Sequence, residues 1–554
     1  MSPVVTVSTM KIVLIYPPQA QPFLPHLALP SLKAFIQLHS SIEVEMIDAS
    51  IESYEYFLSP EFSSERSAPV IESIEKARQY LSRGLDSFDE EKYYHSIEVL
   101  QNALKDVSVR YPGAALDLKD FRMNYSTSSS EQIVRASKDY SQNPYLEFYE
   151  KKLIPRIMEL SPALVGISIG WFSQLIPGFT LARLIRNAKA DLHITIGGSV
   201  ITHLKDVLVY KRKLFPLVSS FAVYEGETSL LELASAIRDK RSIEGVPGLI
   251  YPHGKKEVKI NAPSLLSHLD ELPSPDFEGL PLGRYLSPVP YLPIAASRGC
   301  YWNRCAFCSH HYSLSSFRSR TTETVLGDMK KLRERFGASH FYFVDDALPP
   351  ALVTGLPSAI EREHCQFYWG GELRFDRVFQ NTDFSTIYRG GCRFLLFGME
   401  SACQRVLDLM NKGIDSSMIT GILKNSHQAG IINWVFLFLG FPGETRDEAL
   451  MTVEFVIRNR DYIDMIAPGH FVMTRNSEIC TNPEKFGITR VEKADMDHDF
   501  KTSFAFLADK GISPDEASKI LNDVRTKPEI DKFLKLFVAE VHLMFTGKSS
   551  VAKH

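Results

Sequence analysis

Several features are scarce or missing in this sequence of 554 residues, and each absence excludes a class of protein. It holds seven cysteines, an odd and sparse number that argues against a disulfide scaffold and is usual in a reducing compartment. Its longest apolar stretches, such as residues 434–441, are far shorter than the roughly 18 to 20 residues that cross a bilayer. We therefore expect no membrane span.

An excess of charge of either sign is also missing. The formal net charge is −4, which gives no basic surface of the kind that binds phosphate backbones or anionic lipids. The first basic side chain is Lys11, and Pro17 and Pro18 close the apolar run that follows it, so the N-terminus lacks the pattern of a secretory signal. We expect a cytoplasmic protein that does not bind nucleic acid.

The features that are present are those of a folded enzyme-sized chain. Apolar residues make up 44% of the sequence and charged residues 23%, as in ordinary globular proteins. A single hydrophobic core rarely supports this length, so two large domains are expected.

Apolar runs and helical patterns alternate through residues 1–245. The runs typical of buried strands lie at 11–16, 42–48, 164–169, 193–196 and 221–224. This alternation predicts an α/β domain with a doubly wound, Rossmann-like parallel sheet. Residues 51–160 interrupt it with charged and aromatic residues at helical spacing, which indicates a helical insertion.

A second series of strand and helix signals follows. Residues 246–292 are rich in proline and glycine and are expected to connect two domains. Successive strand–helix units over residues 293–488 predict a full or partial β/α (TIM-like) barrel, with its active site at the carboxyl ends of the strands. Residues 489–554 are expected to form C-terminal helices, with an amphipathic segment at 530–545 that packs on the barrel.

Three cysteines stand close together in the sequence SRGCYWNRCAFCS at residues 297–309, namely Cys300, Cys305 and Cys308. A structural zinc site needs four protein ligands, usually from two separated pairs, and the sequence has no second pair. Three thiolates on an iron-sulfur cluster leave one iron free to bind and reduce another molecule. Incidental thiols, or a zinc knuckle completed by His310 or His311, are the alternatives.

The remaining cysteines are isolated and lie in or beside apolar runs, where buried and inert thiols are common. They are Cys365, Cys392, Cys403 and Cys480. We assign them to core packing.

With its cysteine motif, the sequence resembles the radical S-adenosylmethionine (SAM) superfamily. The family spacing is C-x3-C-x2-C, whereas this chain has C-x4-C-x2-C because of one extra residue within 301–304; the aromatic residue before the last cysteine is retained as Phe307. The resemblance implies that Cys300, Cys305 and Cys308 hold a [4Fe-4S] cluster and that its open iron binds the amino and carboxyl groups of SAM.

Three later segments resemble motifs that follow strands in this family: FYFVDDALP (341–349), LLFGMESACQRVLDLMNKG (395–413) and FLFLGFPGETRDEA (436–449). The resemblance implies contacts to SAM. The implied residues are Phe307, Asp345, Asp346, Glu400, Ser401, Arg405, Gly440 and Pro442.

The implied roles differ along the motifs. Asp345 and Asp346 would receive the methionine ammonium, or alternatively cap a helix. Glu400 and Ser401 would contact the ribose. Arg405 would pair with the methionine carboxylate, or form a surface salt bridge. Gly440 and Pro442 would contact adenine or sugar, or form a plain turn. The GGE letters at 370–372 follow the third strand, and this position argues against the family's methionine-binding role.

The N-terminal domain resembles the cobalamin-binding domain of the B12-dependent radical SAM subgroup, through YPPQAQPFLPHLALPSL (16–32), GGSVITH (197–203) and YEGETSL (224–230). The implied cobalamin-binding residues are Pro18, Ser168, Gly170, Gly197, Gly198, Ser199, Val200, Glu225, Gly226 and Glu227. No D-x-H-x-x-G motif is present, so we expect no histidine ligand to cobalt from that motif. A degenerate flavodoxin-like scaffold is the alternative.

Together the resemblances imply a B12-dependent radical SAM enzyme. Reductive cleavage of SAM would give a 5'-deoxyadenosyl radical, and methylcobalamin would then methylate an unactivated carbon of a small-molecule, lipid or peptide substrate. An external electron donor such as flavodoxin or ferredoxin is implied. The alternatives are a radical rearrangement, cyclisation or ring contraction without methylation, and a cofactor-binding sensor with a structural cluster.

Overall fold

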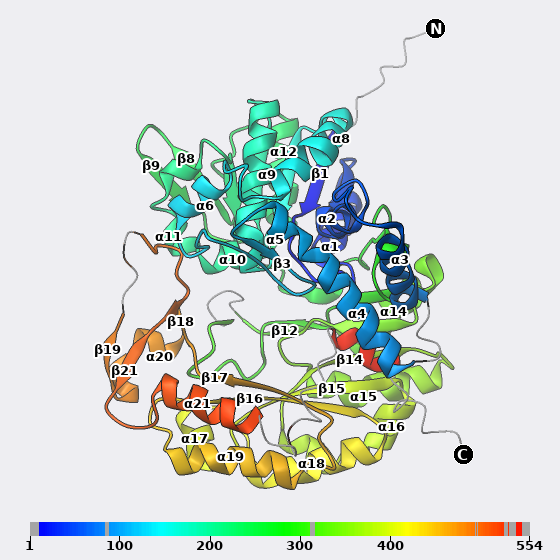
Figure 1. Cartoon of the computed structure of the whole chain (residues 1–554), viewed down its shortest axis with the longest axis vertical. Helices are drawn as coiled ribbons and strands as arrows, with labels where there is room; N and C mark the ends of the chain where they lie inside the picture. The colour runs from blue at the N-terminus through cyan, green and yellow to red at the C-terminus, as the bar shows by residue number, and fades with distance from the viewer. Residues whose placement is uncertain are drawn as a thin grey trace. The chain divides into compact units, whose positions relative to one another are not determined.

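The computed structural model describes residues 10–83, 88–310, 316–492, 495, 497–525, 530 and 539–545. The chain divides into two compact units (Figure 1). Unit 1 comprises residues 1–267, 271–289 and 496–500, and unit 2 comprises residues 268–270, 290–495 and 501–554.

A seven-stranded sheet in the order β2-β1-β5-β6-β7-β8-β9 forms the centre of unit 1. Its first five members run parallel: β1 (Lys11–Tyr16), β2 (Glu43–Asp48), β5 (Leu164–Ser168), β6 (His193–Gly197) and β7 (Ser220–Ala222). This is the 2-1-3-4-5 order of doubly wound sheets, which confirms the predicted Rossmann-like fold. The strand order reverses between β1 and β5, the point beyond whose carboxyl ends such sheets bind ligands.

Helices cover this sheet. Helices α1 (Ala28–His39) and α12 (Gly226–Arg238) pack against each other, whereas α9 (Leu175–Ala188) packs against helices of the insertion. Because both faces are covered, β1 is a continuous run of apolar residues, and the side chains from Ile12 to Ile15 are at most 2% exposed.

The insertion of unit 1 is mainly helical, as predicted. Its helices are α2 (Ala49–Leu58), α3 (Ala68–Arg83), α4 (Glu90–Leu104), α5 (Asp106–Arg110), α6 (Ser130–Ala136), α7 (Tyr145–Phe148), a π-helix (Tyr149–Leu153) and α8 (Ile154–Leu160). A short hairpin of β3 (Ala114–Leu116) and β4 (Phe121–Met123) was not expected. Buried aromatic rings, among them Phe57, Tyr145 and Phe148, fill its interior.

The segment expected to connect the domains contributes to the sheet of unit 1. Strands β8 (Leu249–His253) and β9 (Glu257–Ile260) form an antiparallel hairpin that pairs with β7. The turn between them includes Gly254 at a φ of 55°, a left-handed conformation that glycine adopts without steric cost.

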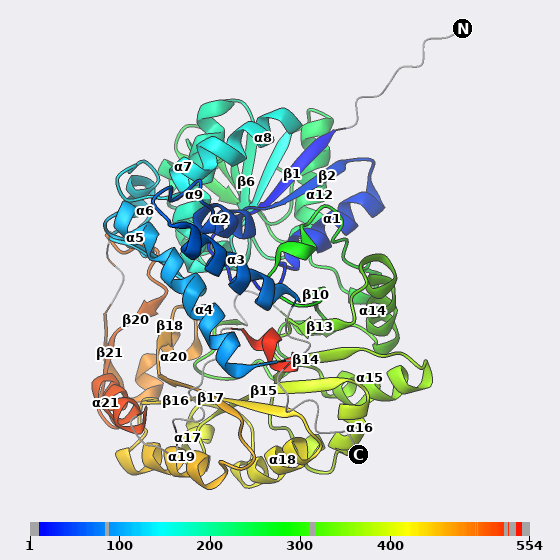
Figure 2. The same cartoon turned by 45° about the vertical axis from the view of Figure 1, so that its right-hand side comes forward.

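Unit 2 is built on a six-stranded parallel sheet in the order β10-β13-β14-β15-β16-β17. The strands are β10 (Tyr291–Ile294), β13 (His340–Phe343), β14 (Tyr368–Leu373), β15 (Cys392–Glu400), β16 (Ile432–Leu439) and β17 (Met465–His470). Helices α14 (Thr322–Phe336), α15 (Pro350–Arg362), α16 (Phe384–Arg389), α18 (Ser416–Gln428) and α19 (Arg446–Arg458) alternate with them (Figure 2). Strands β10 and β17 are the sheet edges, so unit 2 has the partial form of the expected β/α barrel.

The C-terminal part of unit 2 adds two small antiparallel pairs and a helix. β18 (Met473–Thr474) pairs with β20 (Ser503–Phe504), and β19 (Ile488–Val491) pairs with β21 (Phe506–Ala508). Helix α21 (Pro514–Arg525) packs on β16 and on the edge strand β17 (Figure 1). Of the amphipathic segment expected at 530–545, residues 531–538 lie outside the described residues. Within the described ranges, every helix is too short or too polar to cross a membrane.

Candidate active site

The three clustered cysteines lie in one loop beyond the carboxyl end of β10. Strand β11 (Ser297–Arg298) pairs antiparallel with β12 (Arg318–Ser319), and this pairing closes the base of the loop. Backbone contacts hold the loop on the sheet: the Ala306 amide donates to the carbonyl of Met410 (2.8 Å), and the Ile479 amide donates to the carbonyl of Ala306 (3.0 Å). The position of Cys305 and Cys308 is thus fixed by chain segments distant in sequence.

The structure shows how the extra residue between the first two cysteines is accommodated. Asn303 adopts the left-handed conformation with a φ of 48°, which Asn tolerates better than most residues. The Trp302 indole N–H donates to the carbonyl of Asn411 at 2.7 Å. A Cβ on Gly413 would lie 2.0 Å from the Trp302 ring, so a glycine is needed there.

Two buried cations face the cysteine loop. Arg374, which follows β14, places Nη1 4.0 Å from the sulfur of Cys305 and donates from Nη2 to the carbonyl of Lys412 (2.6 Å). The ammonium of Lys412 lies 2.7 Å from the Glu400 carboxylate. Arg374 is 3% exposed and Lys412 6% exposed, so water screens their charges weakly.

Burial is the largest influence on the pKa values of the Cys305 and Cys308 thiols. It raises the pKa of Cys308 to about 12 and also raises the pKa of Cys305, against the opposing effect of Lys412 and Arg374. Iron binding must therefore displace protons from these sulfurs. A donor set of three thiols beside two buried cations fits an anionic, thiolate-bound cluster.

No group of three or more His, Cys, Asp or Glu side chains within the described residues is placed to hold a single metal ion. A cubane cluster makes a different demand, because each thiolate binds a different iron and the sulfurs do not converge on one point. His310, an alternative zinc ligand, contacts the Asp346 carboxylate through Nδ1 at 2.6 Å. His311 lies outside the described residues.

Asp345 and Asp346 follow β13, as predicted, and their contacts differ. The buried Asp345 carboxylate accepts hydrogen bonds from the Ala296 amide (3.0 Å) and the Ser297 hydroxyl, and burial raises its pKa to about 6. It thereby ties β13 to the start of the cysteine loop. Neither residue caps α15, whose N-cap is Pro349 without a side-chain hydrogen bond. Contact with the methionine ammonium stays a prediction.

Glu400 and Ser401 lie at a bulge that ends β15. Glu400 has a φ of 65°, and a Cβ on Gly398 would lie 2.9 Å from its carboxylate and 3.0 Å from the Lys412 ammonium. Gly398 thus leaves the space that this ion pair occupies. The buried Ser401 hydroxyl accepts from the Cys403 amide at 3.1 Å. The ribose contacts of both residues stay predictions.

The turn after β16 is tight, as its glycine and proline residues predict. Gly440 and Gly443 have φ values of 87° and 88°, and Pro442 lies between them. The Gly440 amide donates to the buried Glu444 carboxylate at 2.5 Å, and burial raises the pKa of Glu444 to about 7. This internal hydrogen bond fixes the turn; contacts of Gly440 and Pro442 with SAM stay predictions.

Arg405 makes a two-point contact with Glu448, whose two oxygens each lie 2.5 Å from the guanidinium. We expect Arg405→Gln and Glu448→Gln each to lower the free energy of unfolding by about 1 kcal/mol, because either change breaks this pair. Chemical denaturation checks this, and unchanged stability would contradict it. SAM affinity, measured on both variants, tests the predicted carboxylate contact, since a loss confined to the Arg405 variant would support it.

The predicted cobalamin residues of unit 1 all lie at the carboxyl ends of parallel strands. Pro18 follows β1, Ser168 and Gly170 end and follow β5, Gly197 to Val200 end and follow β6, and Glu225 to Glu227 follow β7. The Ser199 hydroxyl donates to the Gly170 carbonyl at 3.0 Å, which joins two of these loops. The residues near β1 and β5 lie where the strand order reverses.

Packing within the protein itself accounts for one of these glycines. Gly198 has a φ of 108°, and a Cβ there would lie 2.2 Å from the backbone oxygen of Ile169. Gly198 therefore allows the protein's own backbone at Ile169 to come close. Ligand contacts there stay predictions.

Replacing Gly198 by Ala is expected to lower the free energy of unfolding of unit 1 by more than about 2 kcal/mol, because the new Cβ meets backbone that cannot move alone. Gly245→Ala is the matched control, since nothing lies within 4 Å of its Cβ position; we expect a change within about 0.5 kcal/mol. Urea denaturation of the full chain followed by tryptophan fluorescence measures both. Equal stability of the two variants would contradict the assignment.

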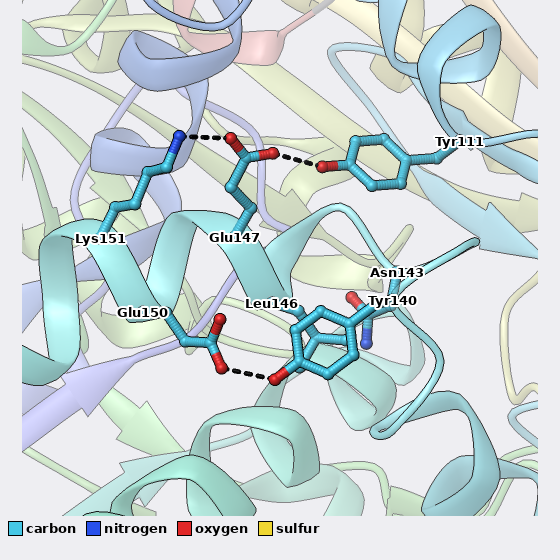
Figure 3. Close-up of a pocket in the computed structure, with 7 residues that line it drawn as sticks. All are labelled: Tyr111, Tyr140, Asn143, Leu146, Glu147, Glu150 and Lys151. Carbon is cyan, nitrogen blue, oxygen red and sulfur yellow. Dashed lines mark hydrogen bonds and ion pairs between the residues drawn. The ribbon is translucent and has the colours of Figure 1, made fainter.

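Figure 3 shows a further pocket, in the insertion of unit 1, with a volume of about 250 Å³. Its polar side chains pair with one another: Glu147 contacts Lys151 and Tyr111, both at 2.6 Å, and Glu150 accepts from Tyr140 at 2.5 Å. These mutual contacts leave the pocket without an evident reactive group.

Residues 294–456 match the model of the Radical SAM superfamily. The matched range begins at the end of β10, includes all three cysteines of the loop, and extends into α19. The matched range therefore includes every residue of unit 2 for which we predicted a SAM contact.

A similar protein matches a longer part of the chain. A protein from Pyrococcus horikoshii named uncharacterized methyltransferase PH0819 is 27% identical over 303 residues, which is 54% of this chain and 65% of that protein. The matched region thus spans somewhat less than two thirds of that relative.

Two solved structures share the fold. One is the cobalamin-dependent SAM radical enzyme OxsB with aqua-cobalamin and SAM bound (TM-score 0.61, 14% identity, 94% of this chain and 67% of that chain). The other is the radical SAM methyltransferase TsrM from Kitasatospora setae with cobalamin and a [4Fe-4S] cluster bound (TM-score 0.59, 15% identity, 96% and 92%). The predicted succession of a Rossmann-like domain and a radical SAM domain is confirmed.

Sequence reasoning assigned no role to the two buried cations. Arg374 and Lys412 are 38 residues apart, and each is adjacent to the cysteine loop only through the fold. Lys412 lies in the motif at residues 395–413, from which only Glu400, Ser401 and Arg405 were predicted to contact SAM. A lysine that is 6% exposed is rarely left so without a function or a partner.

Proposed function

We propose that this protein is a cobalamin-dependent radical SAM enzyme that methylates an unactivated carbon. The observation that carries the proposal is the loop of Cys300, Cys305 and Cys308, which follows β10 beside the buried cations Arg374 and Lys412. When bound, the [4Fe-4S] cluster supplies the electron that breaks a sulfur–carbon bond of SAM, and cobalamin supplies the methyl group.

The chain's own residues would hold and shield these groups. The three thiolates bind iron, and the positive charges of Arg374 and Lys412 offset the negative charge that accumulates on the sulfurs. Asp345 fixes the start of the loop through Ala296 and Ser297. The Phe307 ring, next to the last cysteine in sequence, packs edge-on against Phe438, with centroids 5.2 Å apart.

Unit 1 would bind cobalamin at the carboxyl edge of its sheet. The supporting observation is the position of Pro18, Ser168 and Gly170 at the point where the strand order reverses. Structures that share the fold over more than nine tenths of this chain include ones with cobalamin bound. We propose a cytoplasmic enzyme that receives electrons from a small carrier such as flavodoxin or ferredoxin.

SAM with a deuterated methyl group tests the reaction. The anaerobically reconstituted full chain, with cobalamin and a flavodoxin reducing system, is incubated with a small-molecule extract, and products are analysed by mass spectrometry. A product that carries the intact CD3 group supports methylation. Formation of 5'-deoxyadenosine without label transfer would indicate a rearrangement or cyclisation instead of methylation. Failure to cleave SAM would favour a sensor.

A further inference from the structure

Unit 2 contains a cavity of about 730 Å³ between strands β16 and β17 and the end of α21. One wall is aromatic: Trp434, Phe436 and Phe438 occupy alternate positions of β16 and therefore share one face of the sheet. Ala467 of β17 lines the cavity beside them. The volume lies in the range of pockets that enclose a drug-sized organic molecule.

The ends of the cavity differ from its wall. Glu400, one of the predicted SAM residues, lines it, and this carboxylate is already neutralised by Lys412 at 2.7 Å. Arg525, the last residue of α21, also lines it. Arg525 is exposed, and none of the described residues forms an ion pair or hydrogen bond with it. The cavity therefore combines an apolar, aromatic body with an exposed guanidinium at one end.

We infer that this cavity binds the organic substrate, and that the substrate is an aromatic or otherwise apolar molecule with one anionic group that pairs with Arg525. Aromatic rings stabilise a flat apolar body through area burial and ring stacking, and the guanidinium supplies bidentate recognition of a carboxylate, sulfonate or phosphate. Because Glu400 borders the same cavity, the apolar part of the substrate would extend toward the predicted SAM residues. That the bound molecule is a substrate rests on the proposed function. Its binding to the cavity can be measured without turnover.

Two fluorescent probes of similar aromatic shape test the inference on the reconstituted full chain. 1-Anilinonaphthalene-8-sulfonate carries an anion, and N-phenyl-1-naphthylamine does not. We expect Arg525→Gln to weaken binding of the sulfonate about tenfold, because the charged contact is lost, while binding of the neutral probe stays within about twofold. Ala467→Phe, which fills the cavity, is expected to weaken both probes.

Arg458→Gln is the matched control, because Arg458 ends α19 on the exposed surface and pairs with Glu454; we expect neither probe to respond. Thermal unfolding shows that each variant is folded. Unchanged sulfonate binding in Arg525→Gln, or unchanged binding of both probes in Ala467→Phe, would overturn the inference. Displacement of the sulfonate by SAM alone would also overturn it, since the cavity would then be a SAM site.

Iron and sulfide analysis of the same samples separates the two proposals. A variant that loses probe binding while it keeps its cluster supports the cavity inference independently of the reaction. If the probes bind as expected but the protein fails to cleave SAM, the proposed function is contradicted. The inferred ligand class of the cavity is then still supported.

Discussion

Replacing Cys305 by Ala in the full chain is expected to abolish reductive cleavage of SAM, with a loss of at least about 10³-fold, or about 4 kcal/mol in the activation barrier. The sulfur of Cys305 is the thiol that Arg374 approaches at 4.0 Å, and its loss leaves two thiolates for a cluster that needs three. The same loss is expected for Cys300→Ala and Cys308→Ala. The measurement is 5'-deoxyadenosine formed by the reduced protein under anaerobic conditions.

Cys365→Ala is the matched control, because Cys365 is a free thiol outside the loop. We expect it to keep the iron content and the SAM cleavage of the unmodified chain. Thermal unfolding of the metal-free proteins shows whether each variant folds. If all three loop variants retained cleavage while folded, the cysteines would not hold the reactive cluster.

Replacing Lys412 by Met is expected to lower the free energy of unfolding of unit 2 by about 3 to 5 kcal/mol, because it leaves the Glu400 carboxylate buried without its counter-ion. Burial by itself lowers the pKa of Lys412, but the nearby carboxylate of Glu400 raises it above its ordinary value. The lysine is therefore charged at neutral pH, and the pair is ionic. Guanidinium denaturation of the metal-free chain measures the loss.

A double replacement and a surface pair provide the controls. Glu400→Gln combined with Lys412→Met should recover part of the stability, because no buried charge is left unpaired. Lys330→Met removes an ion pair with Glu363 whose side chains are 49% and 43% exposed, and we expect it to cost less than about 1 kcal/mol. A Lys412 variant as stable as the Lys330 variant would refute this account of the pair.

Strands that are buried on both faces could be predicted closely from the sequence. The run at 11–16 coincides with β1, because a parallel strand between helix layers must be apolar throughout. The run at 434–439 lies within β16 (Ile432–Leu439), where Phe436 and Phe438 are partly buried and line the cavity. The apolar letters of residues 365–369 predict a strand there, whereas the strand of the structure is β14 (Tyr368–Leu373). Its glycines weaken the strand signal, yet a Cβ on Gly370 would lie 2.5 Å from the Phe394 ring, so packing requires the residue that obscures the pattern.

The candidate site was predictable where it is local in sequence. The three cysteines and the strand-end motifs were found because their spacing is short and their positions follow strands. The charges that surround the thiols were not found, because Arg374, which follows β14, and Lys412, which lies well beyond the end of β15, come near Cys305 only in the fold. The contacts of Arg405 and Ser401 with neighbouring side chains likewise depend on the fold.

The central claim is that three thiolates of one loop leave an iron position open for SAM. The most direct test is electron paramagnetic resonance of the anaerobically reconstituted, reduced full chain, with iron and sulfide analysis, before and after addition of SAM. The account predicts iron and sulfide in the ratio of a [4Fe-4S] cluster and a spectrum that changes when SAM binds. Zinc in place of iron, or a reduced cluster whose spectrum does not respond to SAM, would contradict it.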